Sequence, residues 1–405
     1  MKKVTGLLTY MSVGIRDLWW VATNELRHIF RDRGVMLIFF VAGIAYPLLY
    51  NGIYKNEALY EIPVAVVDHS HSPESREFLR KFNAAQEVKI SNRCLSLEEA
   101  KALFTDGEVH GIVYIPSDYH LKLARMEQAT ISIYNDMSSF LYYKGLMMAT
   151  NYTMLDQLRS IQIKRYNAAG IGGEQAEQLV EAIPGNDVGF YNPGGGFASF
   201  LLPALLILII HQTLFFGIGM LAGTAREESR THSSIPEHLH GRGIYRVVIG
   251  KAIAYFLLYI PITAYIVGFI PKFFNLPHIG EIGTLFSFMI PFLLAAIFFS
   301  MTVSVFVKNR ETGLIAFLFF TLILLFLSGF SWPRQNMPEV WRLISYLFPS
   351  THGVQGYIKI NSAGATLSQV RFEYITLWLL AGFYFIAASI SLHLVVKRES
   401  RQIQQ

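Results

Sequence analysis

The sequence predicts a polytopic α-helical membrane protein with six transmembrane helices and an inserted α/β (mixed) extracytoplasmic domain between helices 1 and 2. Composition is the first observation, since 52% of the 405 residues are hydrophobic and only 16% are charged, whereas soluble proteins carry about 25% charged residues. The second is a series of long runs without a charged side chain. The third is a long segment between the first two runs, in which short apolar stretches alternate with helical patterns.

The runs without charge predict the transmembrane helices. A helix needs about 20 predominantly apolar residues to cross the hydrocarbon, and unpaired backbone groups are too costly in lipid for such runs to be irregular. Pro193 and the glycines at 194–196 mark the start of the second helix. The six predicted helices cover residues 34–54, 197–223, 247–271, 282–307, 312–333 and 374–396.

The distribution of lysine and arginine predicts the orientation. With both termini cytoplasmic, the short cytoplasmic segments hold 16 basic residues, and the short outer segments 272–281 and 334–373 hold five. Long loops are translocated largely regardless of their charge. We therefore expect a multi-pass protein of the cell inner (cytoplasmic) membrane, with a cytoplasmic loop at 224–246 and residues 55–196 outside.

The inserted segment has the pattern of an α/β domain, and its size of about 130 residues suffices for one small core. Ser96 and Glu99 have the spacing of a helix capping box, and Asp106-Gly107 ends that helix. Strands are predicted at 62–67, 87–91, 109–115 and 129–134, and helices at 73–84, 97–105, 118–127 and 138–168.

Asp68, at the end of the first of these strands, has two interpretations. It is placed like the nucleophile of a phospho-aspartate phosphatase, but the second acidic residue expected two positions later is Ser70. A structural role in a turn before Pro73 is therefore favoured. The sequence contains no Walker phosphate loop and no G-x-S-x-G elbow. The lone Cys94 excludes an internal disulfide. We predict no catalytic, cofactor-binding or metal-binding residue and no nucleic-acid partner, since the net charge of +5 is spread over a long chain.

The first 33 residues predict an amphipathic helix in the membrane interface. Apolar side chains alternate with basic ones, and two adjacent tryptophans suit the depth of the lipid head groups. Arg27 and Arg31 are four residues apart and share one helix face. The apolar positions are Ile15, Trp19, Val21, Leu26 and Phe30.

Polar residues interrupt the second predicted transmembrane helix near its middle, at His211, Gln212 and Thr213. Ionisable residues at that depth are costly and usually face a cavity or a partner helix. One interpretation is that they line a translocation pathway. The other is that they form hydrogen bonds between helices, which contribute about 0.6 kcal/mol on average.

Four stretches, in this order, carry a family resemblance. They are NELRHIFRDR, IPVAVVDHSHSPESREF with EEAKALFTDGEVHGIVYIPSDY, FYNPGGGFASFLLPALL, and LSGFSWPRQNMPEVWRLISYLFPSTHGVQGYIKI. Together they resemble the permease subunits of type-2 ABC exporters, in the multidrug-exporter-like subfamily with a large extracytoplasmic domain after the first transmembrane helix. The resemblance covers nearly the whole chain.

The resemblance implies a permease without its own ATPase, energised by separate ABC ATPase subunits that carry ATP and magnesium. It implies a second permease copy or a paralogue, and a periplasmic adaptor (membrane-fusion) protein is a further candidate partner. Residues 1–33 resemble the connecting helix, 224–246 the coupling loop, and 334–373 the outer re-entrant helices. The ATPase-coupling residues on this basis are Arg27, Arg31, Glu227, Glu228 and Thr231.

The coupling loop departs from the pattern of this family, because Arg230 stands where glycine is usual and Ser233 where a second glutamate is usual. The subunit therefore either couples differently or is the less active half of a heterodimer. The expected substrate is hydrophobic or amphipathic, such as a drug or a lipid. Two other classes stay open: a non-transporting scaffold or mechanotransmission protein coupled to an ABC ATPase, and an integral membrane enzyme.

Overall fold

The computed structural model describes residues 2–181, 189–228, 235–240 and 243–403. The chain divides into two compact units. One unit, here the membrane unit, consists of Met1–Lys55 and Gly189–Gln405, and the other, here the α/β unit, consists of Asn56–Val188.

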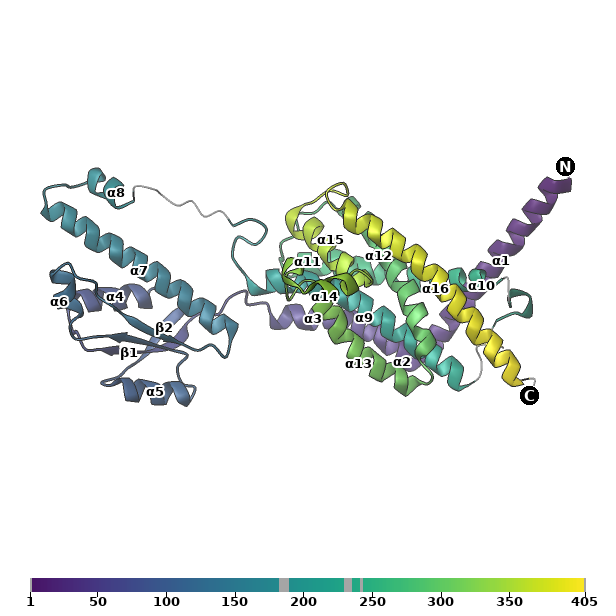
Figure 1. Ribbon diagram of the computed structural model, residues 1–405, viewed down its shortest axis with the longest axis horizontal. Helices are drawn as coiled ribbons and strands as arrows, with labels where there is room; N and C mark the ends of the chain where they lie inside the picture. The colour runs from purple at the N-terminus through teal and green to yellow at the C-terminus, as the bar shows by residue number, and fades with distance from the viewer. Residues whose placement is uncertain (1, 182–188, 229–234, 241–242, 404–405) are drawn as a thin grey trace. The chain divides into compact units, whose positions relative to one another are not determined.

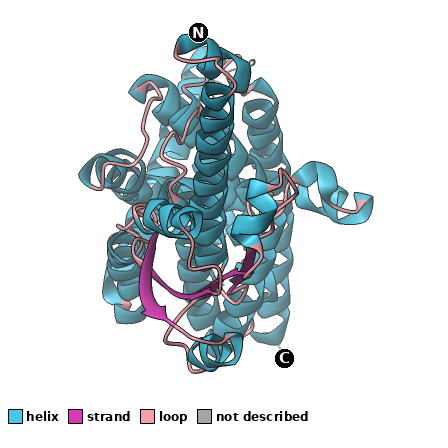
Figure 2. Ribbon diagram, turned by 90° about the vertical axis from the view of Figure 1, so that its left-hand side faces the viewer, coloured by secondary structure: helices cyan, strands magenta, loops and turns pink. Residues whose placement is uncertain are grey.

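The α/β unit contains a four-stranded mixed sheet with the strand order β2-β1-β3-β4 (Figure 2, magenta). β1 is parallel to β2 and β3, and β4 is antiparallel to β3. Strands and helices occur at every predicted place, and α8 is an additional helix. The elements are β1 Ile62–Asp68, α4 Pro73–Asn83, β2 Val88–Arg93, α5 Leu97–Thr105, β3 Gly111–Ile115, α6 Tyr119–Ala124, β4 Ser132–Asn135, α7 Phe140–Ala168 and α8 Glu174–Val180.

Helices cover both faces of this sheet (Figure 1). Successive side chains of a strand point to opposite faces, and β1 follows this rule with buried residues on both sides. Val64 and Val66 pack against Phe82 of α4 and Leu146 of α7. The intervening residues of β1 belong to a second apolar cluster with Ala100 of α5. The run of apolar residues in β1 is thus explained by burial on both faces.

Asp68 has the structural role that the sequence favoured. Its Oδ1 accepts hydrogen bonds from the backbone N–H groups of Ser70 (3.0 Å) and His71 (3.1 Å), and its Oδ2 accepts one from the Ser75 hydroxyl (2.8 Å). Ser72 and Ser75 form a complete capping box at the start of α4. The carboxylate therefore fixes the turn between β1 and α4.

The capping box predicted at Ser96 is incomplete. The Ser96 hydroxyl accepts the N–H of Glu99 at 3.2 Å, as expected. The Glu99 carboxylate, however, accepts the N–H of Leu95 at 2.8 Å instead of that of Ser96. Both contacts satisfy N–H groups at the start of α5, so the helix begins where predicted.

The regular elements among the described residues of the membrane unit are all helices. Two spans contain π-helical segments, labelled η1 and η3, which continue the helix with a wider turn. The elements are α1 Lys2–Arg31, α2 Arg33–Met36, η1 Leu37–Ala42, α3 Gly43–Ile53, α9 Phe197–Glu227, η2 Glu237–Leu239, α10 Ile244–Thr263, η3 Ala264–Phe269, α11 Ile270–Phe273, α12 Ile282–Val303, η4 Ser304–Phe306, α13 Arg310–Leu327, η5 Arg334–Asn336, α14 Glu339–Ser345, α15 Pro349–Ala363 and α16 Arg371–Ile403.

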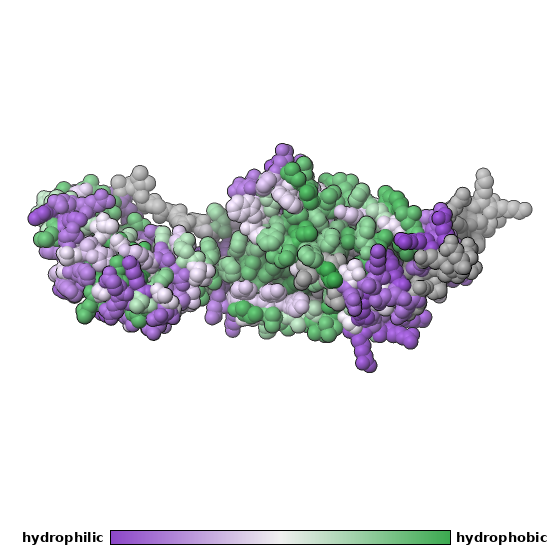
Figure 3. Space-filling view, turned by 60° about the horizontal axis from the view of Figure 1, so that its bottom comes forward, coloured by the Kyte–Doolittle hydropathy of each residue, from purple (hydrophilic) through white to green (hydrophobic). Residues whose placement is uncertain are grey.

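Five helices among the described residues are long and apolar enough to cross a membrane. They are Arg33–Ile53, Phe197–Glu227, Ile244–Phe273, Ile282–Phe306 and Arg371–Arg401. Hydrophobic residues accordingly cover the middle of the membrane unit (Figure 3). α13 lies where a further crossing was predicted at 312–333, but it ends at Leu327. Gly329 follows with a φ of 76°, a left-handed conformation that terminates helices.

α9 is the central helix of this unit, packing against α3, α12, α13 and α15. In its apolar window 83% of the residues are buried, against 28% for Arg33–Ile53 and for Arg371–Arg401. Gly217 allows close packing, since a Cβ there would lie 2.0 Å from the ring of Phe39. α15 is buried along most of its length, and Gly353 and Gly356 lie against Phe292 and Phe288 of α12.

Candidate functional site under the N-terminal helix

The N-terminal helix α1 packs along α10. Its buried face contains Val21 and Ile29, as well as the carboxylates of Asp17 and Glu25. Three of the residues predicted to form its apolar face, Ile15, Trp19 and Phe30, are exposed on the membrane unit, whereas Val21 is buried and Leu26 is partly buried. The helix therefore has one face on the protein and a second, apolar face directed away from it.

Each buried carboxylate of this region is paired with a basic residue of another element. Asp17 forms an ion pair with Arg246 (3.0 Å), and a ring nitrogen of His238 lies within hydrogen-bond distance of its carboxylate (3.3 Å). Glu25 pairs with Lys251 at 2.9 Å and accepts a hydrogen bond from the hydroxyl of Tyr255, both on α10. Because buried charges are costly unless paired, these contacts fix the position of α1 on α10.

A third ion pair follows directly after α1. Asp32 is the N-cap of α2 and accepts the N–H groups of Gly34 (2.9 Å) and Val35 (3.2 Å). Both nitrogens of the Arg310 fork donate to its carboxylate, at 3.0 and 3.2 Å. This bidentate pair connects the junction between α1 and the first apolar span to the start of α13.

Glu25 lies before the first apolar span, and its surroundings shift the pKa of its carboxyl group. Burial alone would raise the pKa of its carboxyl group, but the ammonium of Lys251, the hydroxyl of Tyr255 and the nearby His28 lower it by more. The net shift lowers the pKa, so Glu25 carries its charge at neutral pH.

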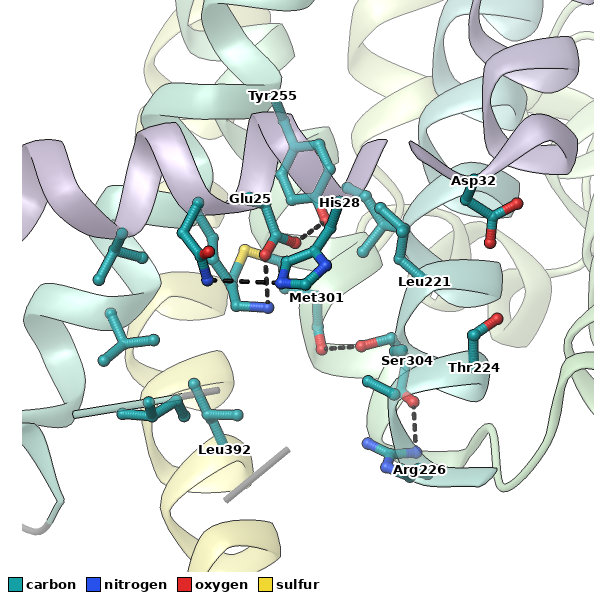
Figure 4. Close-up of a pocket in the computed structure, with 18 of the residues that line it drawn as sticks. Glu25, His28, Asp32, Leu221, Thr224, Arg226, Tyr255, Met301, Ser304 and Leu392 are labelled. Atoms are coloured by element: carbon teal, nitrogen blue, oxygen red, sulfur yellow. Dashed lines mark hydrogen bonds and ion pairs between the residues drawn. The ribbon is translucent and has the colours of Figure 1, made fainter. Parts of the chain in front are cut away.

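A pocket of about 590 Å³ opens beside these pairs, between α1, α9, α10, α12 and α16. Glu25 and His28 reach into it from α1, and Ser304 and Arg226 lie across from them (Figure 4). Its basic side chains are Arg31, Arg33, Arg226, Lys251 and Arg310, its acidic ones are Glu25, Asp32 and Glu228, and its apolar ones include Ile218, Leu221, Met301, Ala388 and Leu392.

Arg226 closes one side of this pocket at the end of α9. Its guanidinium donates to the backbone carbonyls of Ser304 and Val305, both at 2.8 Å, and to that of Val307. These carbonyls lie in η4 or just after it, directly beyond the end of α12, and that of Ser304 also accepts the N–H of Val307 at 3.1 Å. The contacts join α9 to α12 at the same end of the bundle as α1.

The structure separates the residues predicted to contact an ATPase. Arg31 and Glu228 line the pocket, whereas Arg27 is exposed on α1 outside it. Glu227 is the exposed last residue of α9. Thr231 lies outside the described residues.

The buried carboxylates Asp17 and Glu25 were not singled out by sequence. Asp17, Val21, Glu25 and Ile29 follow one another at intervals of four residues, which places them on one helix face. This spacing could have indicated that the two acids lie on the buried face of α1.

Across the described part of the chain, no cluster of three or more His, Cys, Asp or Glu side chains is arranged to hold a metal ion.

His211 is fully buried in α9, with its ring edge-on to Phe299 (5.3 Å between centroids) and Phe292 (6.3 Å). Neither ring nitrogen has a hydrogen-bond partner among the described residues. The Thr213 hydroxyl donates to the carbonyl of Ile209 in its own helix at 2.7 Å. The predicted hydrogen bond from His211 to another helix is thus absent from the described residues, and Gln212 beside it is partly buried.

Comparison with known proteins agrees with this architecture. The family model described as ABC-2 family transporter protein matches residues 33–390. The probable multidrug ABC transporter permease YbhR of Escherichia coli (strain K12) is 20% identical over 344 residues, which cover 83% of this chain and 87% of that protein. The same values hold for the protein of that name from Escherichia coli O157:H7. Since the family model spans most of the chain, including the apolar helices, the protein belongs to the ABC-2 transporter family and is an ABC transporter permease.

Proposed function

We propose that this permease exports a hydrophobic or amphipathic substrate, that a separate ABC ATPase energises it, and that force reaches the membrane unit through α1 and the end of α9. The observation that carries the proposal is the set of ion pairs from Asp17, Glu25 and Asp32 to α10 and α13. Asp17 and Glu25 hold α1 itself, and Asp32 holds the chain directly after it, so α1 cannot move without moving its partners. A displacement of α1 would therefore be transmitted to two other elements of the bundle.

The end of α9 offers a second point for transmission. Glu227 and Glu228 are exposed at the end of the most buried helix of the unit. A push on them would act along α9, and Arg226 would pass it to α12 through the carbonyls of Ser304 and Val305. By this proposal Arg27 and the loop with Thr231 also face the ATPase, while Arg31 lines the pocket.

The proposal includes a topology. All three ion pairs and the pocket would lie on the cytoplasmic side, α13 would complete six crossings, and the α/β unit would lie outside. There the α/β unit is a candidate binding surface for a periplasmic adaptor. A second copy of the permease, or a paralogue, would complete the transporter.

The coupling test replaces Glu227 and Glu228 together by alanine in the full chain expressed with its ATPase. We expect the permease to reach the membrane in normal amount but to lose the ATPase, or to keep ATP hydrolysis without export. The matched control is Glu98→Ala with Glu108→Ala, which removes two exposed charges from the α/β unit. Normal export with a normal complement of ATPase in the Glu227/Glu228 variant would refute the coupling role.

The topology test uses single cysteines in a Cys94→Ala background. Ala102→Cys, exposed on α5, should react with an impermeant thiol reagent in intact cells. Arg398→Cys, exposed near the end of α16, should react only after the membrane is opened. The reverse pattern would invert the orientation, and labelling of both positions in intact cells would exclude an odd number of crossings between them, including the five proposed here.

A further inference from the structure

The pocket under α1 contains basic side chains that none of the described residues neutralises. Five basic and three acidic residues line it, which gives a net charge of +2 with His28 neutral. Lys251 is paired with Glu25 and Arg310 with Asp32. The side chains of Arg31 and Arg33, in contrast, form no ion pair or hydrogen bond with any residue in the described ranges.

These two arginines lie at the boundary of the apolar spans. Arg33 is the first residue of the span Arg33–Ile53, and Arg31 is the last residue of α1. Two other charged residues of the pocket lie at helix ends, with Glu228 just after α9 and Arg310 at the start of α13. This is the depth at which lysine and arginine meet lipid head groups.

Part of the pocket wall is apolar. Leu221 and Ile218 lie progressively farther from the charged end of α9, and Met301 lies before Ser304 near the end of α12. Ala388 and Leu392 of α16 complete the apolar wall. The cavity thus has Arg31 and Arg33 on one side and an apolar wall from α9, α12 and α16 on another, and its volume of about 590 Å³ is within the common range for ligand sites, about 300–1,000 Å³.

We propose that this pocket binds an amphiphile with an anionic head group, of which the anionic phospholipids of the membrane are an abundant source. Arg31 and Arg33 would contact the head group, because guanidinium forks bind phosphate and carboxylate oxygens in pairs. The acyl chain would lie along Leu221, Met301 and Leu392. The proposal does not depend on transport or on an ATPase, since it concerns the permease alone.

Such a ligand would connect α1 to the rest of the bundle. The pocket is bordered by α1 on one side and by α9, α12 and α16 on the other. A molecule that fills it would replace solvent between them and stabilise the docked position of α1. Binding should therefore raise the temperature at which the purified permease unfolds.

The experiment measures thermal unfolding of the full-length permease in a neutral detergent. Phosphatidylglycerol, phosphatidylcholine and inorganic phosphate are added separately at equal concentration. We expect a rise in the unfolding midpoint with phosphatidylglycerol only. We expect this rise to be lost in Arg31→Gln with Arg33→Gln, and retained in Arg27→Gln, which removes an exposed charge four residues earlier on the same helix, outside the pocket.

A second variant tests the apolar part. Ala222→Phe fills the wall of the pocket without changing its charge, so it should also remove the effect of phosphatidylglycerol. An equal rise with inorganic phosphate would identify a site for free anions and refute the amphiphile. An equal rise with phosphatidylcholine would refute the anionic head group. No rise in the unaltered protein, or a rise retained in the Arg31/Arg33 variant, would refute the site.

Discussion

The ion pair between Glu25 and Lys251 allows a quantitative test of how α1 is held. The side chain of Glu25 is 7% exposed and that of Lys251 is 28% exposed, with 2.9 Å between the charged atoms. Breaking a buried pair by removing one partner costs about 3–5 kcal/mol, because the other charge stays buried without compensation. The two single substitutions should differ, since only Lys251 reaches solvent.

Lys251→Met leaves the carboxylate of Glu25 buried and should cost the full amount, about 3–5 kcal/mol. Glu25→Leu leaves an ammonium that water can partly solvate, so we expect about 2–3 kcal/mol, including about 1 kcal/mol for the unpaired hydroxyl of Tyr255. The double variant removes both charges and replaces them by apolar groups of similar size. Such replacements are often close to neutral, so the double variant should be more stable than either single one.

The assay is the unfolding midpoint of the full-length permease in detergent. One kcal/mol corresponds to about 2–4 °C for domains of about 150–250 residues, so each single variant should unfold several degrees earlier. The control is Lys89→Met in the α/β unit, where the partners Lys89 and Glu61 are 59% and 71% exposed, and such exposed pairs contribute only about 0–1 kcal/mol. Additive effects in the double variant would refute the reasoning, because they would mean that the two groups do not interact.

Three further outcomes are expected. Gly217→Val should prevent assembly of the membrane unit, detected as loss of the monodisperse permease in size-exclusion chromatography, because a Cβ has no room beside an aromatic ring of the first span. His211→Leu should keep or raise the unfolding midpoint, since it removes two unpaired buried nitrogens; a large loss of stability would reveal a missing partner. In the α/β unit, hydrogen bonds from the Ser138 side chain and backbone, and then from His110, lower the pKa of Asp136. A group with a lowered pKa stabilises the fold above its unfolded pKa and loses this contribution as pH falls through its folded pKa. Asp136→Asn should therefore reduce the loss of stability measured in acid, and an unchanged pH profile would contradict this role.

Local features of the fold were predictable from sequence. The strand at β1, the ends of α5 and the start of α9 depend on apolar runs, turns and caps within a few residues of one another. Such signals can be read from the short stretch of sequence around each element. The structural role of Asp68 was likewise accessible, because the three residues that donate to it follow within one turn and the start of a helix.

The pairs that build the candidate site were not predictable in this way. Asp17 and Arg246 are 229 positions apart, and Asp32 and Arg310 are 278 apart. Nothing in the spacing of either pair indicates a contact. The acids of α1 also contradict the usual rule for a surface helix, in which polar residues face outward.

The surroundings of a membrane protein explain the exposed apolar face of α1. In water Trp19 and Phe30 would pack on the protein and the acids would be solvated. Next to lipid, an apolar side chain is stable on the outside, so the protein side is available for charged residues that find partners. The sequence correctly indicated an amphipathic helix. Deciding which face of this helix packs on the protein also required knowing what surrounds the other face.

The central position of α9 also has a consequence for biosynthesis. The chain is made from its N-terminus, so α9 leaves the ribosome before α12, α13 and α15, the helices that later enclose it. During that interval His211 lacks Phe292 and Phe299 of α12, which later pack against its ring, and polar groups in lipid are costly. The second span should therefore need an insertase or a similar holding factor until the C-terminal half arrives. Chains truncated before α12 should then be recognised as unassembled and degraded, whereas loss of α16 alone would leave most neighbours of α9 in place.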